Sequence, residues 1–598
     1  MCGIIGCVGR GEETLGTLVH GLSKLEYRGY DSAGVALGGT GGLGVLKRAG
    51  EIEALRAALE GRSEFSGSVG IGHTRWSTHG PPTDENAHPH LDCEGRVAVV
   101  HNGIIENYQA LRDELAGAGH AFESDTDTEV VPHLIEAELA AGSSPEAAFR
   151  AAIGRLEGSF AIACLVAGRE SVFVARNDSP LVLGIAEGAT YLASDVPAFR
   201  EFTDRVVYLE DGQFAELSPD GWVVTDAAGA VVEPPIETVS WDAEDTGKSG
   251  YDHFMLKEIH EQPRALRQCL RGRVDELGGS VTVEELGAFD PERVHLVAAG
   301  TSYHAALYGA QLLCADGIPA EAHYAHEYAS SPPPAAGATV VGVSQSGETA
   351  DTLAATREAR RRGAATLAVT NTVGSTMARE CDETFYIRSG PEIGVAATKT
   401  FAGQQTALNL LTQVVSEATP DRDVVSALRD LPGDIQAVLD GSSAEAVAET
   451  YLDADAYFFI GRGLNYPVAL EGALKMKEIS YEHAEGFAAG ELKHGPLALV
   501  TENTPVFATV VGDDELARKT VGNIKEVEAR NAPVVAVTDG ESDAGRYADH
   551  TLEIPRTNRR TAAIVANVQL QLVSYHTAAK LGRPIDKPRN LAKSVTVE

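Results

Sequence analysis

The chain has 598 residues, of which 43% are hydrophobic and 23% are charged, and its formal net charge is −37. A chain of this length exceeds the size of a single hydrophobic core, so we expect two to four domains. The large negative charge argues against nucleic acid or an anionic membrane surface as a partner. No stretch approaches the roughly 20 apolar residues that a membrane span needs.

The charge is spread along the chain, which favours a strongly solvated surface adapted to a salt-rich cytoplasm, where ions screen the self-repulsion. The first residues, MCGIIGCVGRGEE, lack the basic and apolar regions of a signal peptide. The cysteines number seven and are scattered, which does not suggest a disulfide framework. We therefore expect a reducing, cytoplasmic compartment.

Cys2 follows the initiator methionine and opens a small glycine-rich strand, CGIIG. Removal of Met1 would leave this residue with both a thiol and a free α-amine. A thiol with a pKa of about 8.5 needs a base to become a nucleophile, and an α-amine with a pKa of about 7.7–8.0 can act as that base near neutral pH. Cys2 is therefore either a nucleophile that carries its own base or a small buried cysteine that happens to be second.

Four further motifs decide between these readings. They follow in the order RGYDSAG (28–34), HTRWSTHG (73–80), HNGIIEN (101–107) and SDTDTE (124–129). Together with Cys2 they resemble the glutaminase domain of N-terminal-nucleophile amidotransferases. The resemblance implies αββα layers over residues 1–238, and the pattern places one of the helices near 126–141.

The same resemblance assigns roles to individual residues. Cys2 would attack the glutamine amide, and the Asn102 side chain and the Gly103 backbone N–H would stabilise the resulting oxyanion. Arg75 would bind the α-carboxylate of glutamine and Asp127 its α-ammonium group. Further residues would shape or close the pocket: Trp76, Thr78 and His79 as its walls, and Arg28 and Gly29 in a closing loop.

A group of histidines and a cysteine raises the hypothesis of a metal centre: His88, His90, Cys93 and His101. Their spacing matches no standard zinc pattern, and His101 already belongs to the HNG motif. Packing and hydrogen bonding account for these residues better. We therefore expect neither a metal nor any other cofactor.

Residues 239–248 (VSWDAEDTGK) are polar and lack periodicity, which indicates a linker. The segment KEIHEQP (257–263) then predicts a short helix that ends at its proline, so that linker and helix together occupy 239–284. From about residue 290 onward strands alternate with helices. This pattern is typical of a parallel sheet built from βαβ units.

The second half of the chain also contains an internal repeat. LVAAGTSYHAAL (296–307) is echoed by FFIGRGLNYPVAL (458–470), TLAVTN (366–371) by VVAVTD (534–539), and TFYI (384–387) by TLEI (551–554), at offsets of 163, 168 and 167. Three pairs in order at a nearly constant offset predict two homologous, doubly wound parallel-sheet subdomains, 285–425 and 426–588. A polar tail, 589–598, follows them.

Two short segments in the first of these subdomains stand between a strand and a helix. They are GTS (300–302) and SQSGET (344–349), and each places small hydroxyls and backbone N–H groups at a helix N-terminus, which suits a phosphate group. Simple helix capping explains either segment alone. As a pair in consecutive βα units they resemble the sugar-isomerase domain, which binds phosphosugars.

A third segment, ALEGALKMKEISYEHAEGFAAGELKHGPLAL (469–499), places Glu471, Lys475 and Glu478 on one helix face. A solvated stripe of ion pairs is the ordinary explanation for such spacing. The helix is rich in glycine and alanine, however, and ELKHGP follows it, which is not how a surface helix usually ends. The chain closes with DKPRNLAKSVTVE (586–598), in which Lys593 lies in a segment without periodicity.

With the glutaminase motifs, these segments resemble the isomerising glutamine–fructose-6-phosphate aminotransferase family, also called glucosamine-6-phosphate synthases, over essentially the whole chain. The resemblance implies transfer of the glutamine amide nitrogen to fructose 6-phosphate and isomerisation to glucosamine 6-phosphate. Lys593 would form a Schiff base with the sugar ketone, and Glu478 would move a proton between C1 and C2. His494 would assist ring opening, and Lys475 would support proton transfer.

The resemblance implies further that the phosphate and sugar hydroxyls are bound by Thr301, Ser302, Ser344, Gln345, Ser346 and Thr349. A free lysine has a pKa of about 10.4, so Schiff-base chemistry needs a site that favours the neutral amine, and Lys475 is a candidate neighbouring cation. Partners would be the two substrates and a second copy of the chain, with His494 reaching the site of the neighbouring subunit. Ala397 departs from the family, which often has serine there, so one hydroxyl contact to the sugar is in doubt.

Other readings fit less well. An enzyme acting on phosphoribosyl diphosphate would need an acidic pair before a Gly/Thr-rich loop, and an asparagine-type synthetase would need an SGGxDS loop; neither is found in the sequence. A deglycase or deaminase of related phosphosugars stays open within the enzyme class. A phosphosugar-sensing regulator would not need Cys2, Glu478 and Lys593 together, and the charge argues against the basic DNA-binding domain it would carry.

Overall fold

The computed structural model describes residues 2–39, 42–62, 65–77, 79–239, 247–275, 279–286, 289, 291–334, 337–415 and 421–595. The chain divides into two compact units, Met1–Thr246 with Ser594–Glu598, and Gly247–Lys593. Most of the expected linker, 240–246, lies outside the described residues. Within the part of the chain described, none of the helices has the length and apolar character that crossing a bilayer requires.

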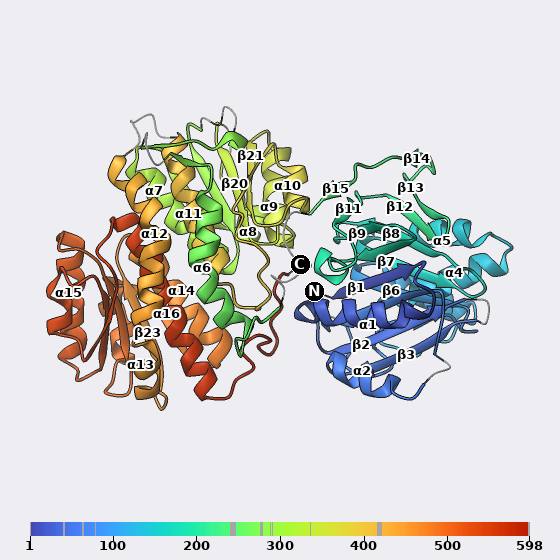
Figure 1. Ribbon diagram of the computed structural model, residues 1–598, viewed down its shortest axis with the longest axis horizontal. Coiled ribbons are helices and arrows are strands. Elements are labelled where there is room, and N and C mark those ends of the chain that lie inside the picture. The colour runs from blue at the N-terminus through green and yellow to red at the C-terminus, as the bar shows by residue number, and fades with distance from the viewer. Residues whose placement is uncertain are drawn as a thin grey trace. The chain divides into compact units, whose positions relative to one another are not determined.

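The first unit contains two antiparallel sheets (Figure 1). The eight-stranded sheet has the order β15-β11-β9-β10-β1-β4-β2-β3 and the seven-stranded sheet the order β14-β13-β12-β8-β7-β6-β5. The strands of the larger sheet are β1 (Gly3–Val8), β2 (Ser32–Gly38), β3 (Gly44–Ala49), β4 (Val69–Arg75), β9 (Val182–Ala186), β10 (Ala189–Ala193), β11 (Arg205–Tyr208) and β15 (Glu237–Thr238). Those of the smaller sheet are β5 (His90–Leu91), β6 (Val97–Ile105), β7 (Gly158–Val166), β8 (Val172–Asn177), β12 (Phe214–Ser218), β13 (Gly221–Thr225) and β14 (Val231–Val232).

Helices cover the outer face of each sheet of this unit. Helices α1 (Thr14–Leu25) and α2 (Ile52–Leu59) pack on the larger sheet, and α3 (Tyr108–Gly117), α4 (Val130–Ala140) and α5 (Pro145–Ile153) share a core with the smaller one. Between the sheets, Ile4 and Val8 of β1 join Val100 of β6 and Leu165 of β7 in one buried cluster. Alternating apolar positions of both sheets thus form the central layer. The expected αββα layers are confirmed, as is a helix near 126–141.

The second unit contains two five-stranded sheets, and every strand pair in them is parallel. Their orders are β19-β18-β20-β21-β22 and β24-β23-β25-β26-β27. The first sheet consists of β18 (Val294–Ala298), β19 (Ala320–Tyr324), β20 (Thr339–Ser344), β21 (Ala365–Thr370) and β22 (Glu383–Tyr386). The second consists of β23 (Tyr457–Gly461), β24 (Ala484–Ala488), β25 (Val506–Val510), β26 (Val534–Thr538) and β27 (His550–Glu553).

The two strand orders are the same when the strands are taken in chain order. The echoed sequence segments fall on equivalent strands: β18 with β23, β21 with β26, and β22 with β27. The predicted repeat and the two doubly wound subdomains are therefore confirmed. A small two-stranded sheet, β16 (Val274–Asp275) with β17 (Ser280–Val281), precedes the first subdomain.

Helices connect the strands of the two sheets, and several of them pack in a core that the two subdomains share. They are α7 (Gly300–Ala315), α8 (Ala325–Ser330), α9 (Ala350–Arg361), α10 (Thr376–Glu380), α11 (Lys399–Val415), α12 (Arg422–Gly441), α13 (Ala444–Thr450), α14 (Asn465–Ser480), α15 (Glu515–Glu528) and α16 (Arg559–Lys580). Helix α16 is buried along most of its length and packs against α14. One hydrophobic cluster joins α7, α12, α14 and α16 to the second sheet, so the subdomains share a core.

The helix predicted to end at Pro263 runs on, and this expectation is wrong. Helix α6 (Phe254–Leu270) contains Pro263 in its interior. A proline cannot donate to the carbonyl four residues earlier, here that of Ile259. The side-chain amide of Gln262 donates to that carbonyl instead, at 3.0 Å. Because the freed acceptor is satisfied locally and the helix is packed on both sides, the proline does not terminate it.

Candidate active sites

The first unit places Cys2 directly before β1, which lies beside β4. The antiparallel register pairs Gly3 with Thr74, so Cys2 comes to the end of β4 and the residues that follow it. The Trp76 backbone N–H donates to Cys2 Sγ at 3.3 Å. Burial raises the pKa of the Cys2 thiol, while the Trp76 N–H and the Arg75 charge act in the opposite direction.

Asn102 is held in one orientation beside Cys2. Its Oδ1 lies 3.1 Å from His73 Nε2, which also lies 3.0 Å from the His101 carbonyl, so this nitrogen carries the proton and donates to both. Burial lowers the pKa of His73 to about 3, which keeps the ring neutral. The amide nitrogen of Asn102 consequently faces Cys2 and donates to its carbonyl at 2.9 Å. The positioning role of His73 was not assigned from the sequence, although His73 opens the HTRWSTHG motif.

Gly103 occupies a position that other residues cannot take. Its φ is +123°, and a Cβ atom there would lie 2.0 Å from the Ser159 carbonyl on the neighbouring strand β7. Glycine alone tolerates both the dihedral and the close approach. The backbone of the HNG motif is therefore fixed next to Asn102.

Arg75 and Asp127 are both buried, and each binds backbone groups of its own unit. Arg75 donates to the carbonyls of His79, Gly80 (3.2 Å) and Pro81 (3.3 Å). Asp127 Oδ2 accepts from the Ile105 N–H at 2.9 Å. Of the remaining expected pocket residues, His79 makes an edge contact with Tyr108, and Thr78 lies outside the described residues.

The histidines of the sequence-level metal hypothesis form a buried hydrogen-bond network. His101 Nδ1 lies 2.9 Å from Thr128 Oγ1, His90 Nε2 lies 3.1 Å from Thr126 Oγ1, and His88 stacks on His73 at 4.0 Å. Burial lowers the pKa of His88, His90 and His101. Cys93 instead lies in a different group, with His120, His133 and Glu136.

In the second unit, the expected phosphate-binding segments follow two adjacent strands. The GTS segment begins α7 after β18, and SQSGET links β20 to α9. Strands β18 and β20 are parallel neighbours, with β19 on the other side of β18, so the order in which strands are added to the sheet reverses between them. In open parallel sheets, ligands bind outside the carboxyl ends of the strands at this point.

The hydroxyls of the SQSGET segment are organised by the loop itself. Ser344 Oγ lies 2.9 Å from Thr349 Oγ1 and accepts from the Gly347 N–H at 3.0 Å. Gly347 has a φ of +65°, and a Cβ atom would lie 2.2 Å from Ser375 Oγ. Thr349 then precedes the first residue of α9. The structure thus brings together Ser344, Ser346 and Thr349 at one helix start.

The equivalent loop of the second subdomain has different chemistry. After β25 the chain continues with Gly512, Asp513 and Asp514, and the Asp514 carboxylate caps α15. Two carboxylates at this helix start repel a phosphate group. The symmetric fold therefore offers the features of a phosphate site in the first subdomain and not at the equivalent loop of the second.

The three charged residues of α14 are joined to the first subdomain. Lys475, fully buried, lies 3.3 Å from Glu471 and also pairs with Glu478, and it donates to Thr301 Oγ1 at 3.1 Å. Glu471 accepts from Thr301 at 3.0 Å and binds His304 at 2.7 Å. Burial opposes the charged form of Lys475, but the two carboxylates outweigh it and raise the pKa above its ordinary value. This is a buried network between the subdomains rather than a solvated stripe.

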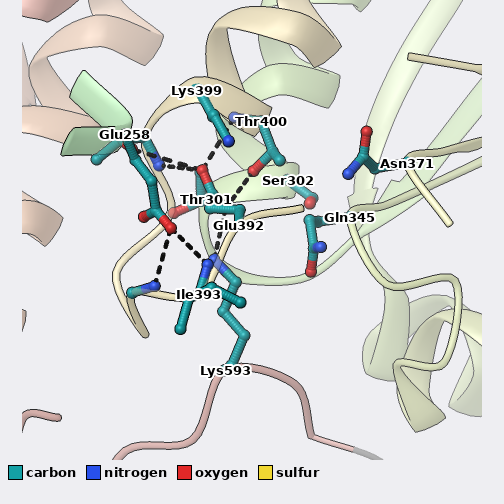
Figure 2. Close-up of polar contacts among 12 residues, drawn as sticks. Glu258, Thr301, Ser302, Gln345, Asn371, Glu392, Ile393, Lys399, Thr400 and Lys593 are labelled. Atoms are coloured by element: carbon teal, nitrogen blue, oxygen red, sulfur yellow. Dashed lines mark hydrogen bonds and ion pairs between the residues drawn. The ribbon is translucent and has the colours of Figure 1, made fainter. Parts of the chain in front are cut away.

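Lys593 enters a second buried cluster (Figure 2). Its Nζ lies 2.5 Å from Glu392 Oε2, which also accepts from Thr400 Oγ1 at 2.6 Å. Glu258 of α6 accepts from the N–H groups of Ile393 (2.5 Å) and Gly394 (3.2 Å). The charge next to Lys593 is therefore a carboxylate, and Lys475, expected as its neighbouring cation, is engaged with Glu471 and Glu478 instead.

The two carboxyl groups of this cluster, Glu258 and Glu392, differ sharply in pKa. Burial, with the Glu392 charge, raises the pKa of Glu258 to about 8. Burial also opposes ionisation of Glu392, but Lys593 and Thr400 lower its pKa to about 2. Two carboxyl groups whose pKa values are driven apart are typical of functional sites. The sequence analysis missed both residues, because Glu258 stands on an amphipathic helix and Glu392 lies in an irregular loop.

Figure 2 also labels Ser302, Gln345 and Asn371 in this region. Ser302 Oγ accepts from Gln404 at 2.9 Å, and the Asn371 amide donates to the Gly390 carbonyl at 2.7 Å. His494 ends a short 3-10 helix, Glu491–His494, and is exposed. It takes part in none of the contacts described above.

Two known families cover these units: the glutamine amidotransferase domain matches residues 73–201 and the SIS domain matches 289–414 and 450–581. Fold and site therefore define a glutamine amidotransferase joined to a pair of sugar-isomerase domains. The chain is 54% identical to glutamine–fructose-6-phosphate aminotransferase (isomerising) of Halobacterium salinarum and 48% identical to that of Thermococcus kodakarensis, in each case over 100% of both chains. The chain belongs to the family of isomerising glutamine–fructose-6-phosphate aminotransferases.

A solved structure supports the same assignment for the second unit. The C-terminal domain of glucosamine-fructose-6-phosphate aminotransferase from Francisella tularensis is 34% identical, with a TM-score of 0.53. The match covers 57% of this chain and 99% of that domain.

Proposed function

We propose that this chain transfers the amide nitrogen of L-glutamine to D-fructose 6-phosphate and isomerises the product to D-glucosamine 6-phosphate, with release of L-glutamate. One observation carries the proposal above the others. A cysteine with an oriented asparagine, Asn102, occurs in the same chain as a buried lysine, Lys593, and a hydroxyl-rich loop, 344–349, at a helix start. A glutaminase alone would not need the lysine site, and a sugar isomerase alone would not need the cysteine site, so their combination points to transfer of nitrogen between them.

The glutaminase half works through Cys2. After removal of Met1, the α-amine takes the thiol proton, and the sulfur attacks the amide carbon of glutamine. The carbonyl oxygen becomes an oxyanion that the Asn102 amide and the Gly103 N–H stabilise. When the intermediate collapses, the amide nitrogen takes the proton back from the α-ammonium group of Cys2 and leaves as ammonia. Water then hydrolyses the thioester to glutamate. Arg75 and Asp127 would hold the α-carboxylate and α-ammonium groups, exchanging their present backbone partners for the substrate.

The isomerase half works through Lys593. Its neutral amine adds to C2 of the open-chain sugar and water leaves, which gives a Schiff base. Ammonia then displaces the lysine and leaves an imine at C2. Glu478 carries a proton from C1 to C2 while the proton of the C1 hydroxyl passes to the nitrogen, which converts the ketose imine to the amino aldose. Because Lys593 is paired with Glu392, we infer that sugar binding separates this pair and releases the amine.

The sugar would be held by the hydroxyl-rich loops. Ser344, Gln345, Ser346 and Thr349, with Thr301 and Ser302, supply hydroxyls, amides and a helix N-terminus for the phosphate and sugar oxygens. Lys475 would support charge near the reacting carbons. Ala397 supplies no hydroxyl, so affinity for the sugar would rest on the remaining contacts.

We propose further that two copies of the chain form the working enzyme and that it acts in the cytoplasm. His494 would assist ring opening in the partner's site, which its exposed position permits. The cysteines are free in the structure, as a reducing compartment would keep them.

The reaction is tested with amide-labelled glutamine and fructose 6-phosphate. Mass spectrometry is expected to find the label in glucosamine 6-phosphate. Cys2→Ala should abolish glutamate release while fructose 6-phosphate still binds, because the two sites lie in different units. Label in free ammonia alone, with no amino sugar formed, would show that the chain is a glutaminase without this acceptor.

Trapping with borohydride tests the role of Lys593. In the presence of fructose 6-phosphate, the reductant should leave a sugar adduct on Lys593, and Lys593→Ala should lose synthase activity but keep glutamine hydrolysis. Lys477→Ala is the matched control, because Lys477 is an exposed lysine of α14. An adduct on another lysine would remove Lys593 from the mechanism.

A further inference from the structure

Four side chains with metal-binding atoms converge on the outer side of the seven-stranded sheet of the first unit. Cys93 stands in the turn after β5, His120 follows α3, and His133 and Glu136 project from α4. His133 and Glu136 are three residues apart, so they share one face of the helix. One thiol sulfur, two ring nitrogens and one carboxylate oxygen from these residues all lie within 4.8 Å of one another.

The separations suit a tetrahedral ion at the centre. Cys93 Sγ lies 3.6 Å from His133 Nδ1 and 3.8 Å from His120 Nδ1. Bond lengths of 2.3 Å to sulfur and 2.0–2.1 Å to nitrogen place two tetrahedral ligands about 3.5 Å apart. Glu136 Oε2 lies 3.3 Å from His133 Nδ1, which fits the same geometry, and 2.8 Å from His120 Nδ1, which is a hydrogen-bond distance.

The surroundings resemble those of bound metals. Both histidines turn Nδ1 inward, and His133, whose side chain is 1% exposed, has Nε2 3.8 Å from the Glu129 carboxylate. A carboxylate behind the ring is a frequent second partner of a metal-binding histidine. The Ala121 N–H points at Cys93 Sγ from 3.5 Å, as a donor to a thiolate would. Glu129 in turn accepts hydrogen bonds from Ser124 and from the backbone N–H of Glu123, which fix the position of its carboxylate behind His133.

We propose that Cys93, His120, His133 and Glu136 bind one zinc ion in a closed, structural site. Thiolate, imidazole and carboxylate are the ligand types that zinc takes, and one thiolate with one carboxylate balances its charge. The proposal departs from the expectation of no metal, which rested on the spacing of His88, His90, Cys93 and His101. The three histidines of that set bond to Thr126 and Thr128 instead. Cys93 belongs with side chains that lie 27 to 43 residues further along the chain.

The ion would tie together three segments: the turn after β5, the end of α3 and the start of α4. Between His120 and His133 the chain carries Asp127, whose carboxylate binds the Ile105 N–H of β6. The site would therefore hold this segment in place, a role that does not depend on the proposed reaction. Loss of the ion would loosen the first unit and leave the second intact.

Metal content of the full-length protein is the direct test. Protein purified without a metal-affinity tag from zinc-supplemented cells should contain one zinc per chain by mass spectrometry. Cys93→Ser should bind zinc at least about tenfold more weakly. Cys314→Ser is the matched control, because Cys314 is an exposed cysteine of the second unit and should leave the content unchanged.

Cobalt substitution tests the thiolate ligand directly in the wild-type protein. The wild-type protein should take up one Co²⁺ per chain and show a thiolate-to-cobalt charge-transfer band, which Cys93→Ser should lack. A chelator should lower the melting temperature of the first unit, and added zinc should restore it. Wild-type protein that contains no zinc and gives no such band with cobalt would overturn the proposal and leave a hydrogen-bonded cluster.

Discussion

At the scale of single residues, burial decides which carboxyl groups around Lys593 are ionised, because an unpaired buried charge is costly. Glu258 and Glu392 lie in the same buried region as one lysine, Lys593, while Lys399 pairs with Glu261 at 2.7 Å. Glu392 pairs with Lys593 and is ionised, whereas Glu258 has no such partner among the described residues and keeps its proton near neutral pH. A neutral Glu258 beside an ionised Glu392 gives the site an acid and a base at the same pH.

Glu258 should make stability fall as the pH rises. Its pKa is about 8 in the folded chain against an ordinary value of 4.5. Between these values the native state keeps a proton that the unfolded chain releases, so the free energy of unfolding decreases with pH and levels off above about 8. Glu258→Gln keeps the neutral form at every pH, so its melting temperature should decline less over this range.

Melting curves between about pH 4.5 and 8 check this difference, because other titrating groups are common to both proteins. Glu528→Gln, an exposed change on α15, serves as the control and should follow the wild type. Parallel curves for Glu258→Gln and the wild type would show that Glu258 does not hold its proton.

Gly103→Ala should disrupt the HNG segment. The new Cβ atom would meet the Ser159 carbonyl, and alanine at a positive φ carries a strain of about 1–3 kcal/mol. We expect lower stability and loss of glutamine hydrolysis, with fructose 6-phosphate binding retained. Gly117→Ala is the control, because that glycine ends α3 with no neighbour within 4 Å and should be neutral or slightly stabilising. Equal effects of the two changes would refute the steric argument.

The proximity of candidate site residues was predictable where they belong to recognisable motifs. Cys2, Asn102 and Gly103 come from short segments whose order carries the resemblance, and the structure brings them together. Glu258 and Glu392 were missed because they are far apart in the sequence and only the fold makes them neighbours. The same reason hid His120, His133 and Glu136 as companions of Cys93.

At the scale of elements, hydrophobic periodicity and the internal repeat predicted the fold better than single helix-breaking residues did. The repeat predicted two sheets of the same topology because each echo marked a strand at the same position in its sheet. Pro263 misled the prediction of α6, since proline usually ends a helix and the compensating side chain cannot be recognised from a pattern. The helix continues past Pro263 because the buried amide of Gln262 donates to the carbonyl that the proline cannot serve.

Gln262→Leu should therefore destabilise the second unit. The Gln262 amide donates to the Ile259 carbonyl and to Gln571 of α16 at 2.9 Å, and all these groups are buried. Leucine would leave two buried acceptors without a donor, at a cost of about 1–3 kcal/mol each. Gln436→Leu on α12 is the matched control, because that amide is exposed and bonds only within its helix. Urea unfolding of both variants measures the difference, and equal midpoints would mean that Gln262 does not sustain the helix.

At the scale of the whole molecule, the net charge of −37 dominates. Self-repulsion of this size opposes the compact state, and dissolved ions screen it over about 10 Å at 0.1 M and about 3 Å at 1 M. Many of the acidic side chains pair with arginine or lysine, but the excess of acids leaves exposed carboxylates without a cation. The composition therefore couples stability to the salt concentration.

The melting temperature should rise steadily as potassium chloride increases from 0.1 to 1 M, because screening removes repulsion in the folded state faster than in the expanded chain. A variant with Glu60→Gln, Glu187→Gln, Asp220→Asn and Glu502→Gln isolates the electrostatic part, since these four residues are exposed and carry four of the negative charges. The variant should be more stable than the wild type at 0.1 M, and the two should approach each other at 1 M. Sucrose, which stabilises proteins without screening charge, should raise both melting temperatures equally. A difference between the two proteins that persists unchanged at 1 M salt would mean that repulsion among surface carboxylates is not what the salt relieves.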